Sequence, residues 1–203
     1  MLFRSTQDFS SFLLQAQASK AKIIGLANAG GDTINSIKQA SEFGIVKGGQ
    51  NLAGMLVFIT DIHGIGLEKA NGLILTNTFY WDLNNKTRAW SKRYAAQHNG
   101  GMPTMSQAGV YSSVLEYLIA VQKLGSDDGT KVIASMKNKS FEDPLFGKSM
   151  IRDDGRNIHA AYLFQVKTPA ESKGPWDYYK LRATIPADEA FRPLKDGGCP
   201  LVK

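Results

Sequence analysis

The sequence predicts an α/β protein: a parallel sheet flanked by helices, followed by further helices and a small antiparallel β piece. Apolar runs at residues 21–27, 52–59 and 72–78 alternate with segments of helical spacing. Such alternation is typical of parallel strands that helices cover on both faces. After residue 100 the pattern changes to a long helical segment and β-like runs, the last of them at 178–185. A composition of 43% hydrophobic and 21% charged residues in 203 is that of a globular protein with a sizeable core.

The helices are predicted from apolar spacing and from the residues that cap them. Asp8 is a candidate N-cap for the first helix and Asp32 for the second. A further helix is expected at 88–98, and Thr104 with Gln107 forms a capping box before the longest helix. The apolar stripe of that longest helix consists of Val110, Val114, Tyr117, Leu118 and Val121.

The stretch GLANAGGDT, residues 25–33, joins the first apolar run to the following helix. It matches neither phosphate-binding glycine motif, because its spacing is not G-x-G-x-x-G and no Gly-Lys-Ser/Thr follows. It does stand at the carboxyl end of a predicted parallel strand, where α/β sheets bind ligands. Two interpretations stay open for Asn28, a ligand contact or part of a tight turn, whereas Asp32 is expected mainly to cap the helix.

Polar and aromatic residues follow the next two predicted strands. Asp61 and His63 come after the second strand, and Asp61 is either the partner of a ligand's ammonium group or a solvated acid. His63 is expected as a neighbour of the same site. Tyr80 follows the third strand, where an aromatic ring is a candidate wall for a small-molecule pocket; the alternative is packing beneath the next helix.

Other function classes find little support in the residues. The net charge is +6, but the basic residues are spread along the chain without the clustered stripe of a nucleic-acid-binding protein. There is no G-x-S-x-G and no nucleophile with a base, so no enzyme activity is predicted, and no cofactor or metal site. Cys199 is the single cysteine, and no apolar run approaches the length of a membrane span.

Four stretches, taken in order, carry a resemblance to a known family. They are DFSSFLLQAQASKAKIIGLANAGGDTINSIKQASEFGI, GLILTNTFYWD, TRAWSKRYAAQHNGGMPTMSQAGVYSSVLEYL and DGRNIHAAYLFQVKTPAESKGPWDYYKLRATIPADEAFRP. Over nearly all of residues 8–203 the chain resembles the C-terminal part of substrate-binding proteins of branched-chain amino acid ABC importers, which are type I periplasmic binding proteins. The closing stretch VKTPAESKGPWDYYK is the most specific.

The resemblance implies two α/β lobes that are joined by three crossing segments and hold a solute between them. Residues 6–100 would be lobe 2, 101–160 part of lobe 1, and 161–203 crossing strands and a tail. The implied ligand-binding residues are Asn28, Ala29, Gly30, Asp61, His63 and Tyr80. In leucine-binding relatives a tyrosine packs on the ligand where this chain has Ala29, so a bulkier amino acid or an aromatic acid is expected here. Asp61 would pair with a ligand's ammonium group.

Partners and location follow from the same resemblance. The expected partners are a small-molecule solute and an ABC permease in the membrane, and the expected location is the periplasm. An alternative use of the same fold is a ligand-sensing domain of a receptor or regulator.

The start of the sequence carries a further expectation. The first helix begins abruptly, and Leu2–Ser5 is also what a common sequencing adapter encodes. Met1–Ser5 is therefore predicted to be an assembly artefact, and a signal peptide to have been lost upstream. Lobe 1 elements without their strands are expected to expose an apolar face, which predicts poor solubility.

Overall fold

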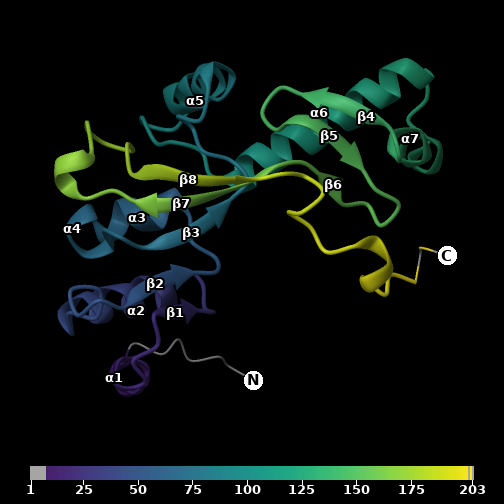
Figure 1. The fold of residues 1–203 in the computed structure, drawn as a ribbon. Helices are drawn as coiled ribbons and strands as arrows, with labels where there is room; N and C mark the ends of the chain where they lie inside the picture. The colour runs from purple at the N-terminus through teal and green to yellow at the C-terminus, as the bar shows by residue number, and fades with distance from the viewer. Residues whose placement is uncertain (1–7, 201, 203) are drawn as a thin grey trace. The chain divides into compact units, whose positions relative to one another are not determined.

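A computed structural model describes residues 8–200 and 202 (Figure 1). Met1–Ser5, predicted to be an artefact, lie outside the described residues. The α-helices are α1 Ser10–Ala18, α2 Gly30–Glu42, α3 Ile59–Ile65, α4 Leu67–Ala70, α5 Asn85–Gln97, α6 Met105–Leu124 and α7 Gly129–Met136. The strands are β1 Ile23–Leu26, β2 Asn51–Gly54, β3 Ile74–Asn77, β4 Ser140–Asp143, β5 Gly147–Ile151, β6 Asn157–Ile158, β7 Ala161–Val166 and β8 Tyr179–Ile185. Two 3₁₀ turns lie at Pro169–Glu171 and Leu194–Asp196.

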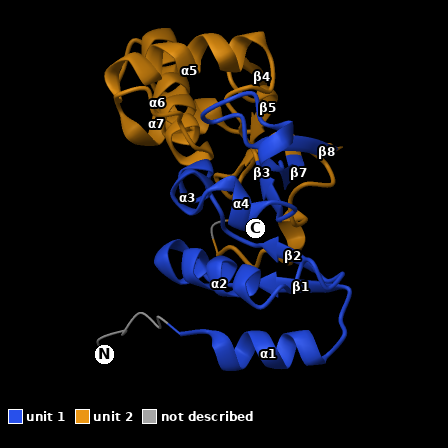
Figure 2. Ribbon diagram, turned by 90° about the vertical axis from the view of Figure 1, so that its left-hand side faces the viewer, with its two compact units in different colours: residues 1–77, 162–183 blue, residues 78–161, 184–203 orange. Residues whose placement is uncertain are grey.

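The chain divides into two compact units, coloured separately in Figure 2. Unit 1 comprises residues 1–77 and 162–183, and unit 2 comprises residues 78–161 and 184–203. The chain therefore passes between the units three times. The sequence predicts lobe boundaries at residues 100 and 160, whereas the chain changes unit after residues 77, 161 and 183. The assignment of lobes stays a prediction.

Unit 1 is built on a five-stranded sheet in the order β1-β2-β3-β7-β8. Strands β1, β2 and β3 are parallel, and β7 pairs antiparallel with β3. Helices α2, α3 and α4 contact one another beside these strands. The buried residues come from both layers: Leu26, Leu52, Leu75 and Phe164 from the strands, and Ile37 and Ile62 from the helices. The predicted parallel sheet is thus present, with its antiparallel extension on the β3 side.

The predicted second strand, 52–59, is wrong in its C-terminal half. Strand β2 ends at Gly54, and α3 begins at Ile59. The carboxylate of Asp61 accepts a hydrogen bond from the backbone N–H of Phe58 at 2.8 Å, which satisfies one of the free donors at the start of this helix. A short apolar run does not by itself distinguish a buried strand from the start of a buried helix.

Two predicted helix caps are displaced. The N-cap of α1 is Phe9, and Asp8 accepts instead from the backbone N–H of Ser10 at 2.9 Å. Helix α2 begins at Gly30, whose φ of +57° is the left-handed conformation that favours glycine. Asp32 therefore lies in the first turn rather than at the cap, where its charge still complements the positive end of the helix dipole.

Unit 2 combines α5, α6 and α7 with a three-stranded antiparallel sheet, β4-β5-β6. The predicted capping box is confirmed: the backbone N–H of Thr104 donates to Gln107 Oε1 at 2.9 Å, and Thr104 Oγ1 accepts from the N–H of Ser106. A small core gathers Phe79, Ala108, Leu145 and Phe146, with Trp90 and Tyr111 packed against it.

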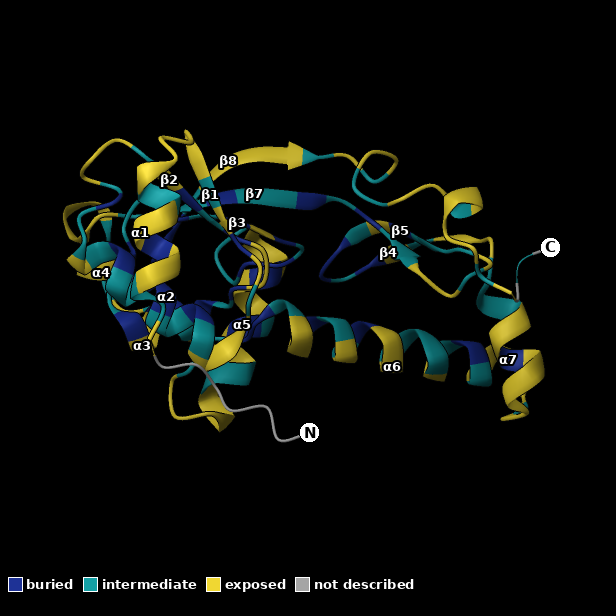
Figure 3. Cartoon of the chain, turned by 90° about the horizontal axis from the view of Figure 1, so that it is seen from below, coloured by how far each residue is buried: buried dark blue, intermediate teal, exposed yellow. Residues whose placement is uncertain are grey.

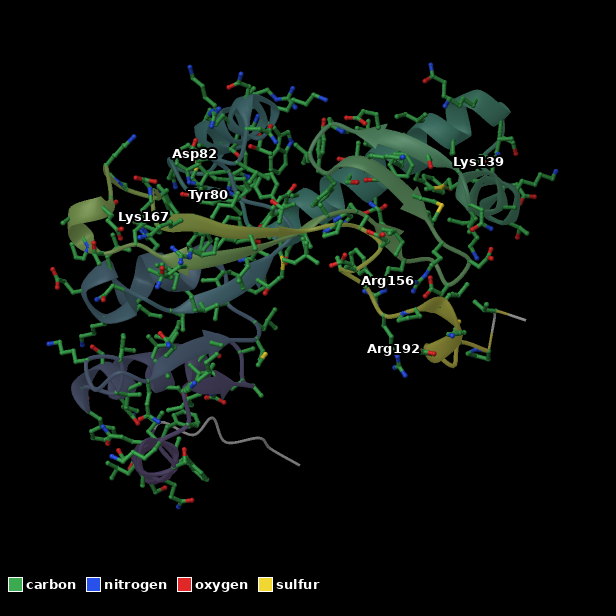
Figure 4. The ribbon with its side chains drawn as sticks, viewed as in Figure 1. Tyr80, Asp82, Lys139, Arg156, Lys167 and Arg192 are labelled. Carbon is green, nitrogen blue, oxygen red and sulfur yellow. The ribbon has the colours of Figure 1, made fainter. Side chains whose placement is uncertain are left out.

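Buried polar groups also hold unit 2 together. Asp143 is fully buried, and its carboxylate accepts from the backbone N–H groups of Leu145 and Phe146 and from the hydroxyl of Ser112. This network ties α6 to the turn after β4. Near the C-terminus, the guanidinium of Arg156 lies 5.6 Å from the ring centre of Phe191; Arg156 is labelled in Figure 4.

The apolar stripe of α6 is exposed in its centre. Val110, Val114 and Leu118 are 65%, 52% and 56% exposed, and the outer face of α6 shows in Figure 3 as a series of exposed and intermediate residues. The buried residues of the helix are the small ones, Ala108, Ser112 and Ala120. The apolar face expected from the sequence is therefore present on unit 2.

Candidate functional site

The candidate site is the edge of the unit 1 sheet at which its parallel strands end. Strands β1, β2 and β3 lie side by side and end at Leu26, Gly54 and Asn77. The backbone N–H of Met55 donates to the carbonyl of Leu26 at 3.1 Å, so the loops after β1 and β2 start next to each other. Ligands of open α/β sheets bind at this edge.

The loop after β1 is held by its own polar side chain. Asn28 Nδ2 donates to Ser36 Oγ at 3.0 Å, and its Oδ1 accepts from Thr33 Oγ1 at 2.8 Å. The half-buried Asn28 is therefore tied to the first turns of α2. Ala29, in extended conformation, and Gly30 are exposed and form the outermost part of the loop. The structure thus accounts for Asn28 as a loop-forming residue, and its contact with a ligand stays a prediction.

Asp61 lies in the first turn of α3, close behind the end of β2. One carboxylate oxygen, Oδ2, accepts from the backbone N–H of Phe58, and the side chain is half-buried. The bond fixes the carboxylate near the helix N-terminus, where a negative charge is stabilised. Among the residues that the structure describes, Asp61 Oδ1 accepts no hydrogen bond, so the side chain can anchor the helix and still accept a hydrogen bond from a cation.

His63 does not join the other candidates. Its ring stacks on Trp176 with centroids 4.0 Å apart, and Nδ1 lies 2.7 Å from the hydroxyl of Tyr178. Both partners precede β8, and the turn from β7 to β8 lies at the amino end of β3, because Val166 donates to the carbonyl of Leu73. His63 is therefore placed toward the opposite end of the sheet from the loop at Ala29. His63 lies two residues after Asp61 on the same helix, so its side chain is directed to another side. Sequence spacing alone did not reveal this.

Tyr80 belongs to unit 2 and is almost completely buried, 6% exposed. Its ring meets that of Trp81 at 5.9 Å in an edge-on arrangement. Nearby, Arg88 pairs with Asp82 at 2.7 Å; Tyr80 and Asp82 are labelled in Figure 4. Tyr80 is therefore buried, and both of its interpretations, a pocket wall or packing beneath the next helix, stay predictions.

Sequence reasoning missed three residues at the edge of unit 1. Met55 and Leu56 follow β2 and are 65% and 40% exposed. Asn77, at the end of β3, is buried; its Nδ2 donates to the carbonyl of Val57, while its Oδ1 has no partner among the described residues. The strand predicted at 52–59 included Met55 and Leu56, so the sequence did not indicate them as loop residues at the edge. Gly54 was the available signal, because glycine commonly marks the end or a bend of a strand.

The described residues contain no group of three or more metal-binding side chains that could hold an ion. Within the same part of the chain, no helix is both long enough and apolar enough to cross a bilayer.

Comparison with known proteins decides the family. The family model described as "Periplasmic binding protein" matches residues 4–175. The chain belongs to the periplasmic binding protein family. A solved periplasmic binding protein from Burkholderia mallei is 53% identical, with a TM-score of 0.88, over 98% of this chain and 52% of that one. A search of curated proteins finds no match.

Other solved members of the periplasmic binding protein family show the same fold. A branched-chain amino acid ABC transporter ligand-binding protein from Burkholderia xenovorans is 43% identical, with a TM-score of 0.89, over 98% of this chain and 53% of that one. A solute-binding protein from Rhodopseudomonas palustris, in complex with 3,4-dihydroxybenzoic acid, is 22% identical with a TM-score of 0.73, over 89% of this chain and 49% of that one. This chain spans about half the length of the solved relatives.

Proposed function

We propose that this chain is the solute-binding part of an extracytoplasmic protein that captures an amino acid or a small organic or aromatic acid and delivers it to an ABC importer in the membrane. Membership of the periplasmic binding protein family supports a solute-binding role. The observation that carries the proposal further is the edge of unit 1, where a fixed carboxylate, Asp61, and an exposed apolar side chain, Met55, follow the same strand. The relatives include proteins named for branched-chain amino acids and one in complex with an aromatic acid.

Each side chain at this edge has a different expected role, which follows from its chemistry. The Asp61 carboxylate is suited to the ammonium group of an amino acid, because oppositely charged hydrogen-bonded groups give the stronger polar contacts. Met55 offers a flexible, polarisable surface to the apolar body of a solute. Ala29, on the neighbouring loop after β1, has a small side chain, which favours a ligand with a bulky side chain or an aromatic ring.

Hinge closure is the proposed mechanism. The three passages of the chain between the units supply the segments at which such a motion bends. A solute shifts the population toward the closed form only by its preference for that form. The closed form is then the one that the permease receives.

A ligand panel tests the proposal. The 203-residue chain is melted with amino acids and with aromatic and aliphatic acids, each up to the millimolar range. A true ligand raises the free energy of unfolding by RT ln(1 + [L]/Kd), about 2.7 kcal/mol at a hundredfold excess over Kd, and the melting temperature rises with it. No shift with any member of the panel would contradict the proposal.

The role of Asp61 is tested on matched ligands. Asp61→Asn removes the charge but keeps an acceptor for the N–H of Phe58, whereas Asp61→Ala removes both. If Asp61 binds ammonium, Asp61→Asn weakens phenylalanine far more than 3-phenylpropanoate, which lacks only the amine. Equal weakening of both ligands would remove Asp61 from this role while leaving solute binding itself intact.

A further inference from the structure

The sequence contains two Asn-Gly dipeptides, Asn71–Gly72 in unit 1 and Asn99–Gly100 in unit 2. Asparagine before glycine has a reactivity of its own, because the backbone nitrogen of the glycine lies close to the side-chain amide carbon. Glycine has no Cβ to hinder the approach of these two atoms. Asparagine is accordingly among the residues that limit the chemical lifetime of proteins at raised temperature. Neither dipeptide has a role in the proposed function.

The fold holds Asn71 away from this reaction. Its Nδ2 donates to the carbonyls of Leu67 and Glu68 at 3.2 and 2.8 Å. The backbone N–H of Gly72, which contains the nitrogen that would attack, donates to the carbonyl of Val166 on β7 at 3.0 Å. An attack therefore requires the amide to leave both carbonyls and Gly72 to separate from the five-stranded sheet. Such openings in a core element are rare, because their cost approaches that of global unfolding.

Asn99 lacks these restraints. Its side chain is exposed, and it makes no hydrogen bond within the part of the chain that the structure describes. Asn99 has a φ of +50° and Gly100 a φ of +79°, so the two residues form a left-handed turn directly after α5. The N–H of Gly100 donates to the carbonyl of Ala95 at 2.9 Å, a bond to the last turn of the same helix. Because helix ends fray, this bond opens at a small fraction of the cost of unfolding.

We propose that Asn99 is a site of spontaneous deamidation, and that the fold protects Asn71 from the same reaction. The backbone nitrogen of Gly100 loses its proton to a solvent base and bonds to Cγ of Asn99, while the bond from Cγ to Nδ2 breaks. The amide leaves as ammonia, with a proton taken from water, and a cyclic imide remains. Water then opens the imide at either of its carbonyls. The products are aspartate and isoaspartate, and no oxidant or reductant is needed.

Both products change the connection between α5 and α6. Each places a carboxylate directly after the last turn of α5, where the end of the helix dipole is already negative, so the new charge is unfavourable. Isoaspartate also carries the main chain through the former side chain, which adds a carbon atom to the backbone. The turn in which Gly100 bonds to Ala95 then no longer fits that hydrogen bond. We expect the modified chain to unfold at a lower temperature.

The experiment compares the two dipeptides in one chain, folded and unfolded. The 203-residue chain is kept at mildly alkaline pH, which favours the deprotonated backbone nitrogen, either in buffer or in concentrated urea. Samples are digested at intervals under acidic conditions, where the reaction is slow. Mass spectrometry then measures the loss of the unmodified peptide around each dipeptide. The unfolded sample is the matched control, because it removes the fold and leaves the local sequences unchanged.

In the folded chain Asn99 should react at least about tenfold faster than Asn71, whereas in urea the two rates should agree within about threefold. Equal rates in the folded chain would overturn the proposal, and so would an Asn71 that reacts first. If Asn99 stays slow in both samples, the reactivity is absent from the local sequence itself, and the proposal fails as well.

Two variants measure the consequence for stability. Asn99→Asp reproduces the aspartate product, and Asn99→Ser is the control that removes the amide without adding a charge. Asn99→Asp should melt below Asn99→Ser, and the isoaspartate fraction separated from an aged sample should melt lower still. If aged Asn99→Ser loses as much melting temperature as the aged native chain, the damage lies at another residue and the assignment is contradicted. No solute enters any of these measurements, so they are independent of the proposed function.

Discussion

Unit 1 and unit 2 bury their apolar residues to different extents. In unit 1 the strands and helices of one α/β layer enclose large side chains such as Ile37, Leu75 and Phe164, each less than 3% exposed. In unit 2 the longest helix buries alanine and serine and exposes a row of valine and leucine. Unit 1 contains a sheet of five strands, whereas unit 2 contains one of three. The comparison shows that α3 of unit 1 buries its large apolar side chains, whereas α6 of unit 2 exposes a row of them.

The largest expected effect is in the core of unit 1. Phe164 is fully buried and stacks on Tyr179 at 5.3 Å. Phe164→Ala should lower the free energy of unfolding by about 3–5 kcal/mol, because it removes packed surface and leaves a cavity. Phe12→Ala is the matched control in the same unit, since Phe12 is 63% exposed; it should change the free energy by no more than about 0.5 kcal/mol. Urea unfolding followed by circular dichroism measures both, and similar losses would refute the enclosed core.

A smaller effect is expected from an ion pair of unit 1. Lys167 Nζ lies 2.5 Å from Asp177 Oδ1, and both side chains are less than a fifth exposed. Asp177→Asn should cost about 1–3 kcal/mol, since it leaves a partly buried ammonium group without its counter-charge. The exposed pair Arg88–Asp82 of unit 2 is the comparison, and Asp82→Asn should cost at most about 1 kcal/mol.

The same pair predicts a pH dependence. Burial raises the pKa of Asp177, but the hydrogen bonds from Lys167 and from the N–H of Lys173 outweigh it, so the net pKa lies below its usual 3.8. A lowered folded-state pKa contributes stability that is present above the unfolded value and is lost as the pH falls through the folded value. The stability difference between the native chain and Asp177→Asn should therefore shrink below pH 3.8. A difference that grows on acidification would show that the pair does not act in this way.

The capping box of unit 2 should matter by about 1 kcal/mol. Thr104→Ala removes the hydroxyl that accepts from the N–H of Ser106, and loss of such a cap typically costs this much. Thr104→Ser keeps the hydroxyl and should retain most of the stability. Thermal unfolding distinguishes the two variants; equal losses would assign the effect to the methyl group instead.

The smallest effect is expected where the two units differ most. Val114→Ser should change the free energy of unfolding of the 203-residue chain by no more than about 0.5 kcal/mol, because the side chain is exposed. The same variant should reduce self-association, measured by sedimentation, since it interrupts the apolar row on α6. A loss of about 2 kcal/mol or more would mean that the row is buried in solution, and the contrast between the units would disappear.

Local patterns in the sequence determined much of the fold. Alternation of apolar runs and helical spacing predicted the parallel strands β1, β2 and β3, and the pair Thr104 and Gln107 located the start of α6 correctly. These features depend on neighbours within a few residues, which are visible in the chain itself. The resemblance likewise predicted a periplasmic binding protein, and the family comparison bears it out.

Tertiary structure alone decided the composition of the candidate site. The sequence placed Asp61 and His63 together, but the helix between them turned His63 onto Trp176 and Tyr178, residues more than a hundred positions away. Met55 came to the edge because β2 ends at Gly54, before α3 begins at Ile59. Which face of α6 is buried was likewise set by its partners in space. Periodicity fixes which residues share a face, whereas only the packed neighbours determine what that face meets.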